Sequence, residues 1–270
     1  MIPRWSGFSA RRVGAVILRH IYVMRSSPVR VIEMAYWPTV QMILWGFISQ
    51  FFLTHSDWLV QAAGALVSAV LLWDVVFRGN LGLSLSFLEE MWSRNLGHLF
   101  VSPLRPYEHV VALTLMSFIR TIIGVTPAAL LAIVFYEVNV FDMGLPLVAF
   151  FANLMVMGWV VGLGVSAMVL RFGLGAESLA WVFVFAFAPL SGIYYPIDTL
   201  PEWLQPVAWA LPPAHVFEGM RGVLFDGVFH MGHFAAAVGL NIVYLTATIA
   251  LFLWVFHSAR RRGQLLNMGE

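Results

Sequence analysis

The chain has 270 residues, of which 60% are hydrophobic and only 11% are charged, and its formal net charge is +1. Soluble domains are roughly 45–50% apolar and about 25% charged, so this composition excludes a water-soluble globule and indicates an integral membrane protein. The absence of Cys and Lys excludes disulfides, thiol chemistry and the phosphate-binding lysine of a P-loop, and the small net charge gives no indication of a nucleic-acid partner.

Residues 9–27 are predicted to form an amphipathic helix. Apolar residues recur at helical spacing on one face: Val13, Val16, Ile17, Ile21 and Met24. The other face carries Arg11, Arg12, Arg19 and Arg25. Such a helix is expected to lie in the membrane interface, with its apolar face in lipid and its arginines toward anionic headgroups.

Six apolar segments are candidates for membrane-spanning helices, because about 20 apolar residues cross a hydrocarbon core about 30 Å thick. They are residues 31–53, 59–77, 109–136, 145–170, 178–193 and 236–257. The fifth is short and ends at Pro189 and Gly192, which favours a continuation into irregular structure. The predicted fold class is therefore an all-α polytopic membrane protein with six transmembrane helices and a single integral domain over residues 1–270.

The arginines predict the orientation. Six spans place both termini on one side, and Arg78 falls on that side, in the polar stretch after the second span. Of the 15 arginines, only Arg221 falls on the opposite side, and Arg120 lies within the third span. Because basic residues concentrate in cytoplasmic loops, both termini are expected in the cytoplasm and the chain in the inner membrane. Glu33 and Asp74 are the candidate counter-ions of Arg120, which forms either a structural ion pair or a substrate contact.

Residues 85–103 mix charged and apolar side chains, which predicts a short cytoplasmic helix before Pro103 and Pro106. One face is expected to lie on the protein and the other to meet a cytosolic partner. The candidate partner contacts are Glu89, Glu90, Trp92, Arg94 and Leu99. An ordinary solvated helix at the membrane surface would show the same pattern.

Residues 189–222 contain six prolines, which forbid one long spanning helix. Short re-entrant or interfacial helices are therefore expected over residues 194–222 on the outer side, against protein or a water-filled cavity. Four aromatic residues would either anchor at headgroup level or gate a substrate path: Tyr194, Tyr195, Trp203 and Trp209.

In the fourth span, Gly158, Gly162 and Gly164 with Ser166 form a small-xxx-small pattern, which predicts a close approach between helices.

Two pairs of side chains on the outer side suggest a different function. His215 with Glu218, and His230 with His233, have the spacing of three that places metal ligands on one helix face. The alternative hypothesis is an intramembrane metal-assisted hydrolase or transferase that uses these residues. An ion-coupled secondary transporter is a third possibility, weakened by few intramembrane acids and no clear inverted repeat.

Two stretches resemble a known family. The outer stretch PLSGIYYPIDTLPEWLQPVAWALPPAHVFEGMRG, residues 189–222, resembles the signature of ABC type-2 exporter permeases. The stretch EEMWSRNLGHLFVSPLRP, residues 89–106, is similar to the coupling-helix region of that family. The likeness covers nearly the whole chain and is closest to the branch that exports lipo-oligosaccharides and daunorubicin-type drugs.

The resemblance implies the membrane subunit of an ATP-driven exporter, with no catalytic residue, cofactor or metal of its own. It implies two copies of this chain in the membrane and two separate P-loop ATPases that bind ATP and Mg²⁺. The N-terminal helix and residues 89–103 would seat on the ATPases, and the cargo would be an amphiphilic lipid-linked saccharide, lipid or drug. An external gate would be shaped by Gly192, Tyr194, Tyr195, Pro196, Pro201, Trp203, Pro212 and Arg221.

Overall fold

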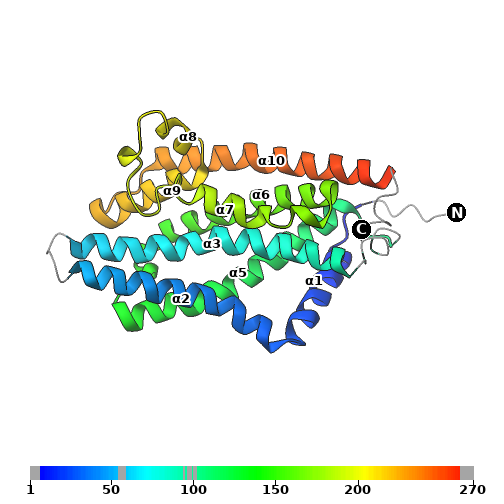
Figure 1. The fold of residues 1–270 in the computed structure, drawn as a ribbon, viewed down its shortest axis with the longest axis horizontal. Coiled ribbons are helices and arrows are strands. Elements are labelled where there is room, and N and C mark those ends of the chain that lie inside the picture. The colour runs from blue at the N-terminus through cyan, green and yellow to red at the C-terminus, as the bar shows by residue number, and fades with distance from the viewer. Residues whose placement is uncertain (1–6, 54–58, 94, 96–98, 100–101, 262–270) are drawn as a thin grey trace.

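The computed structural model describes residues 7–53, 59–93, 95, 99 and 102–261. Every regular element in these ranges is a helix, which confirms the predicted all-α class. The long helices run roughly along the longest axis of the molecule, and α1 (Ala10–Arg25) crosses one end of this bundle (Figure 1). The long helices are α2 (Pro28–Leu53), α3 (Leu59–Trp92), α5 (Pro106–Tyr136), α6 (Leu145–Phe172) and α10 (Met231–Arg261).

Four helices of the described chain are long and apolar enough to cross a membrane: residues Gly64–Trp92 of α3, and the whole of α5, α6 and α10. The segment predicted as the fifth span forms only a nine-residue helix, α7 (Leu179–Phe187), followed by turns. At 1.5 Å per residue α7 is about 13 Å long, less than half of a hydrocarbon core about 30 Å thick. The count of six spans therefore stays a prediction.

The second predicted span is wrong in its end point. It was expected to end at residue 77, but α3 continues as one helix to Trp92. Two of the polar residues that interrupt the hydropathy pattern are buried and bonded: Asn80 Nδ2 donates to the carbonyl of Ala180 at 2.8 Å, and Ser84 Oγ donates to the carbonyl of Asn80 at 2.9 Å. Arg78, expected in a cytoplasmic loop, consequently lies within α3.

Helix α3 lies at the centre of the bundle, where small residues let α6 approach it. A Cβ atom added to Gly158 would lie 2.9 Å from the carbonyl oxygen of Val76, and one added to Gly162 would lie 3.0 Å from that of Asn80. The structure confirms the close approach predicted from the glycine spacing. On the other side of α6, Asn241 Nδ2 of α10 donates to the carbonyl and side-chain oxygens of Asn153, both at 3.0 Å.

The proline-rich segment breaks into short helices, as predicted. Proline occupies the first turn of both α8 (Gln205–Trp209) and α9 (Pro212–Arg221), where its missing N–H costs no hydrogen bond. The position of these helices relative to a membrane stays a prediction. The short elements of the chain are η1 (Val140–Met143), η2 (Leu174–Ala176), η3 (Ile197–Thr199), α8 (Gln205–Trp209), α9 (Pro212–Arg221) and η4 (Gly222–Asp226).

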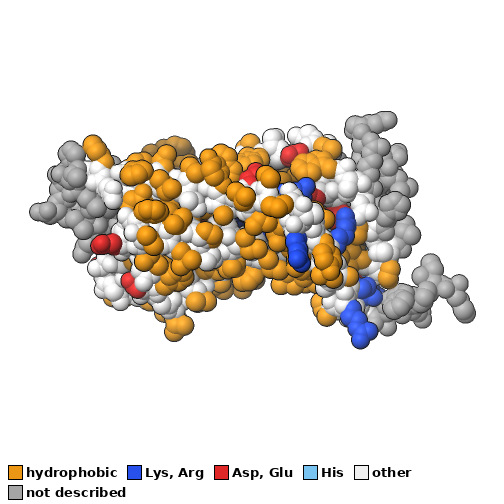
Figure 2. Space-filling model, turned by 90° about the horizontal axis from the view of Figure 1, so that it is seen from below, with side chains coloured by type: hydrophobic (Ala, Val, Ile, Leu, Met, Phe, Trp, Pro, Cys, Tyr) orange, Lys and Arg blue, Asp and Glu red, His pale blue; other side chains and the backbone are white. Residues whose placement is uncertain are grey.

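Charge is distributed unevenly along the bundle. Figure 2 shows a broad band of hydrophobic side chains over the middle of one face, with arginines gathered toward one end. The described chain also begins, at α1, and finishes, at the C-terminus of α10, at that end (Figure 1). Both observations agree with the predicted orientation, although which side is cytoplasmic stays a prediction.

Candidate functional site

Helix α1 exists as predicted, but its apolar face is not free for lipid. Val13 and Val16 are buried and pack with Leu104 and Ala112, around the start of α5. The periodicity of α1 identified its apolar face correctly and could not identify the surface that covers it. The prediction that this face lies in lipid is therefore wrong for Val13 and Val16.

The buried carboxylate of Glu108 fixes the start of α1 to the start of α5. Glu108 is fully buried and accepts hydrogen bonds from Ser9 N at 2.8 Å, Arg105 N at 3.0 Å and Arg12 Nε at 2.8 Å. Glu108 is not among the residues predicted from the sequence. A usable signal exists nonetheless, because an acidic residue two positions after Pro106 is typical of a capped helix start.

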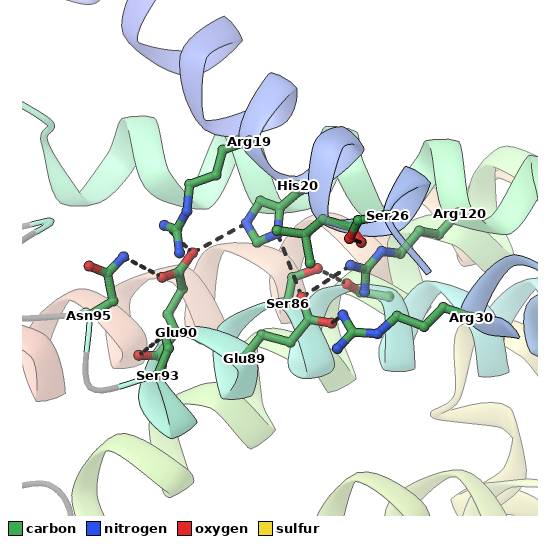
Figure 3. Close-up of polar contacts among 12 residues, drawn as sticks. Arg19, His20, Ser26, Arg30, Ser86, Glu89, Glu90, Ser93, Asn95 and Arg120 are labelled. Carbon is green, nitrogen blue, oxygen red and sulfur yellow. Dashed lines mark hydrogen bonds and ion pairs between the residues drawn. The ribbon is translucent and has the colours of Figure 1, made fainter. Parts of the chain in front are cut away.

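A second group of charges joins α1 to the end of α3, and we call it the ionic clasp (Figure 3). Glu90, only 1% exposed, pairs with Arg19 of α1 at 2.7 Å. Glu89 pairs with Arg30 of α2 at 3.1 Å and with Arg120 of α5 at 3.2 Å. The ionic clasp consists of Arg19, His20, Arg30, Glu89, Glu90 and Arg120, and the His20 ring nitrogens lie 3.7 and 3.6 Å from the two carboxylates.

The ionic clasp corrects two expectations. Arg120 has Glu89 as its counter-ion, whereas neither Glu33 nor Asp74 forms an ion pair with it within the described residues. Arg12 and Arg19 bind carboxylates of the protein rather than lipid headgroups, because their side chains point to α5 and α3. Of the interface arginines, Arg11 and Arg25 are exposed as predicted.

The residues predicted to contact an ATPase occupy different environments. The carboxylates of Glu89 and Glu90 contact charged side chains of α1, α2 and α5 in the ionic clasp. Trp92 is 48% exposed, and Leu99 packs beside Val13 and Val16. Arg94 lies outside the described residues. Their role in coupling stays a prediction.

One face of α1 remains exposed after these contacts. Leu18 is 49% exposed and Tyr22 is 61% exposed, and Arg11 lies on the same side at helical spacing. Large apolar side chains that line one exposed face of a helix are typical of an interaction surface. Helix α1 thus has one face held by α3 and α5 and another that is open.

A cavity of about 550 Å³ adjoins the ionic clasp, between α2, α3, α5 and α7. Trp37 of α2 and Phe185 of α7 are both more than half exposed, so this wall reaches the molecular surface. The cavity therefore offers both charged and aromatic groups to one ligand. Its charged lining consists of Arg30, Glu33, Arg78, Glu89 and Arg120. Its aromatic lining consists of Trp37, Phe77, Trp92, Trp181 and Phe185.

An aromatic stack bridges α2 and the segment after α7 beyond this cavity. The rings of Trp45 and Tyr194 lie 4.8 Å apart with an angle of 21° between them. Gln41 lines the cavity, and Trp45 lies one helical turn further along α2. Burial raises the pKa of Tyr194, which keeps the phenol neutral. The predicted gate residue Tyr194 thus has a partner, Trp45, that no sequence pattern identifies.

Arg221 ties the turn after α7 to α9. Its Nη2 donates to the carbonyls of Gly192 at 2.6 Å and Tyr195 at 2.8 Å, and to Glu218 Oε1 at 3.0 Å. Gly192 has a φ of +65°, which favours glycine, and a Cβ atom there would lie 2.8 Å from Ile197 Cδ1. Three of the predicted gate residues, Gly192, Tyr195 and Arg221, therefore meet in one network.

The other predicted gate residues shape or flank this network. Tyr195 Oη donates to the carbonyl of Pro189 at 2.7 Å. Pro196 precedes η3, and Pro212 is buried at the start of α9. The carbonyl of Pro201 accepts a hydrogen bond from Leu204 N at 2.8 Å in the turn after η3. The nearby Trp203 is 75% exposed. Their role in gating stays a prediction.

The outer histidines do not form the metal site that the alternative hypothesis requires. His215 and His233 approach each other, with their Nδ1 atoms 3.3 Å apart, but Glu218 instead accepts hydrogen bonds from Ile197 N and Arg221. Across the described ranges, no group of three or more His, Cys, Asp or Glu side chains is placed to hold a metal ion. The structure gives no support to a metal-assisted enzyme.

The comparison with protein families decides the class of this protein. The family model for the ABC-2 type transporter matches residues 21–225, which run from the end of α1 into η4 and include the cavity and the Arg221 network. The chain belongs to the ABC-2 type transporter family. This permease is a transport subunit of the membrane, and membrane subunits of its family work with ABC ATPases. No curated protein matches the chain.

Proposed function

We propose that this permease is the membrane subunit of an ATP-driven exporter that moves an amphiphilic substrate out across the cytoplasmic membrane. Two copies of the chain would form the path, and two ATPase subunits would bind ATP and Mg²⁺. The observation that carries the proposal is the ionic clasp, because it connects α1, which has an exposed face, to α3 and α5, which line the cavity.

Helix α1 would act as the lever between the ATPase and the cavity. The partner ATPase would contact Leu18 and Tyr22 on the exposed face of α1. On the opposite face, Arg12 and Arg19 are bound by carboxylates that are 0% and 1% exposed. Losing the charge of Glu108 costs about 2–3 kcal/mol, and the Arg19–Glu90 pair, whose arginine is 41% exposed, contributes less. When the ATPase displaces α1, the ends of α3 and α5 would therefore move with α1, and α1 would not slide over them.

The proposed topology has six spans. Helices α2 and α7 would complete the set formed by α3, α5, α6 and α10, with both termini in the cytoplasm. The clustering of arginines at the end where the described chain begins and finishes supports this orientation (Figure 2). Phe47 on α2 and Phe185 on α7 are each 63% exposed, which suits contact with lipid or with the second copy.

The lining of the cavity supports an amphiphilic substrate. Charged groups near the ionic clasp and exposed aromatic side chains on α2 and α7 belong to the same cavity. A ligand that carries a polar head and an apolar body would match both parts. The Trp45–Tyr194 stack and the Arg221 network would close the outer end of the path.

Charge reversal within the ionic clasp tests the proposal. In proteoliposomes that contain the permease and its ATPase, Glu90→Arg should abolish ATP-dependent transport, because the introduced guanidinium would repel Arg19. The double variant Arg19→Glu with Glu90→Arg should recover part of the transport. Glu202→Arg, a reversal at an exposed outer position, should leave transport unchanged. Full transport by the single Glu90→Arg variant, or no recovery in the double variant, would reject the ionic clasp as the connection.

A further inference from the structure

Arg78 is a buried arginine whose hydrogen-bond donors are not fully used. It lies in the middle of the apolar helix α3, and only 9% of it is exposed. Its Nε and Nη2 atoms have no hydrogen-bond partner, and Arg78 forms no ion pair within the described residues. Burying a guanidinium group whose Nε and Nη2 donors make no hydrogen bond is costly, so its position in the wall of a cavity indicates a ligand that accepts those hydrogen bonds.

The neighbouring helix leaves room for this side chain. A Cβ atom added to Gly124 of α5 would lie 3.2 Å from Arg78 Cδ and 3.4 Å from Arg78 Nε. Arg120 lies one helical turn before Gly124, and its Nε is also buried without a partner. Two arginines with unused donors, Arg78 of α3 and Arg120 of α5, therefore line the cavity.

The acids around Arg78 do not satisfy these donors. Glu89 is already engaged by Arg30 and Arg120. Asp74 lies one turn earlier on α3 and Glu33 is exposed on α2, and neither forms an ion pair with Arg78. The charged side chains near Arg78 are of both signs, so the net charge does not identify the ligand. The unused donors do, because a ligand that satisfies them must carry acceptor oxygens.

We propose that Arg78, with Arg120 beside it, binds the phosphate-type anionic head of the amphiphilic substrate in this cavity. A guanidinium group presents donors in a planar fork that matches two oxygens of a phosphate. The apolar body of the ligand lies along Trp37, Trp181 and Phe185, which lead from the cavity to the surface. This assignment rests on the proposed transport function and adds the chemical class of the substrate head.

Binding to the full chain in nanodiscs of zwitterionic lipid tests the proposal. The probe is dodecyl phosphate, and dodecyl maltoside and dodecyltrimethylammonium are the neutral and cationic probes with the same tail. Inorganic phosphate and diphosphate are the probes without a tail. The tryptophan fluorescence of the cavity and the shift in Tm report binding. Dodecyl phosphate should bind, the other two amphiphiles should bind at least tenfold more weakly, and the free ions should not raise Tm.

Arg78→Gln is the decisive variant. It should weaken the binding of dodecyl phosphate about 10- to 100-fold, the range expected for hydrogen bonds to a charged group. Its Tm without probe should be equal to or above that of the wild type, because it removes an unpaired buried charge. Arg25→Gln, at an exposed position of α1, is the matched control. It removes an arginine outside the cavity lining and should bind dodecyl phosphate normally, unless the probe acts only through the charge that it adds to the lipid.

Three results would overturn the proposal: equal binding of dodecyl phosphate by Arg78→Gln, equal binding of the cationic amphiphile, or a lower Tm of the variant without probe. Equal stabilisation by inorganic phosphate alone would overturn the amphiphilic assignment. These measurements need no ATPase. Loss of ATPase coupling with normal probe binding would therefore reject the proposed function alone, and normal coupling without probe binding would reject this inference alone.

Discussion

Replacing Glu108 by Gln should release α1 from the bundle. The substitution keeps the size of the side chain but removes the charge that Arg12 contacts through Nε at 2.8 Å and Nη2 at 2.5 Å. It also turns an amide N–H₂ toward one of two groups that are themselves donors, the backbone N–H of Ser9 or that of Arg105, because these bond to different oxygens of Glu108. A hydrogen bond to a charged group contributes about 1.5–3 kcal/mol, and the Arg12 side chain keeps some access to water, at 16% exposed. We expect a loss of about 2–3 kcal/mol in the docking free energy of α1.

Hydrogen exchange of the α1 amides measures this loss. A change of about 2–3 kcal/mol corresponds to exchange about 30- to 150-fold faster, while the amides of α6 should keep their rates. Arg12→Met should have a similar effect, and the double variant should add little, because both changes break one pair. Arg11→Met, at the exposed neighbouring position, is the matched control. If Glu108→Gln accelerates exchange no more than Arg11→Met, the carboxylate does not hold α1.

Three further predictions concern stability and the outer segment. Gly46→Ala should lower stability by about 1–3 kcal/mol in thermal unfolding, because its Cβ would overlap the Tyr136 ring, while Gly64→Ala, with open space, should not. Burial lowers the pKa of His215, so the folded state favours the neutral ring; stability is full above pH about 6.5 and falls below it. The protection factors of the α9 amides, which correct for the slower intrinsic exchange at low pH, should therefore be smaller at pH about 5.5 than at about 7.5, and His215→Gln should remove the difference. Arg221→Lys replaces the planar guanidinium that bonds the carbonyls of Gly192 and Tyr195, so it should speed proteolysis of the turn after α7 about tenfold. An unchanged rate of proteolysis would show that Arg221 does not hold this turn.

The long apolar helices could be predicted from the sequence because their length and composition suffice. Helices α5, α6 and α10 coincide with predicted spans to within several residues, and the dense prolines correctly predicted short helices before α10. The end of α3 could not be found in this way. Hydropathy treats Arg78 and Asn80 as groups that need water, whereas Asn80 is bonded to the backbone of α7.

The roles of the charged residues depended on contacts between distant parts of the chain. Glu89 and Glu90 follow an apolar run and precede prolines, which is typical of an exposed loop, and only tertiary structure brings Arg19 and Arg30 to them. The periodicity of α1 likewise reveals an apolar face but not the surface that covers it. The Trp45–Tyr194 stack joins residues from two segments with no shared motif.

The dependence on a partner ATPase is tested most directly by cross-linking from the exposed face of α1. The chain contains no Cys, so Leu18→Cys and Tyr22→Cys each introduce a unique thiol, and Val13→Cys places one on the buried face as a control. With a short thiol-reactive photo-cross-linker in native membranes, the two exposed positions should capture an ATP-hydrolysing P-loop subunit, and Val13→Cys should not. ATP-independent transport by the purified chain, with no ATPase captured from either exposed position, would contradict the proposed function.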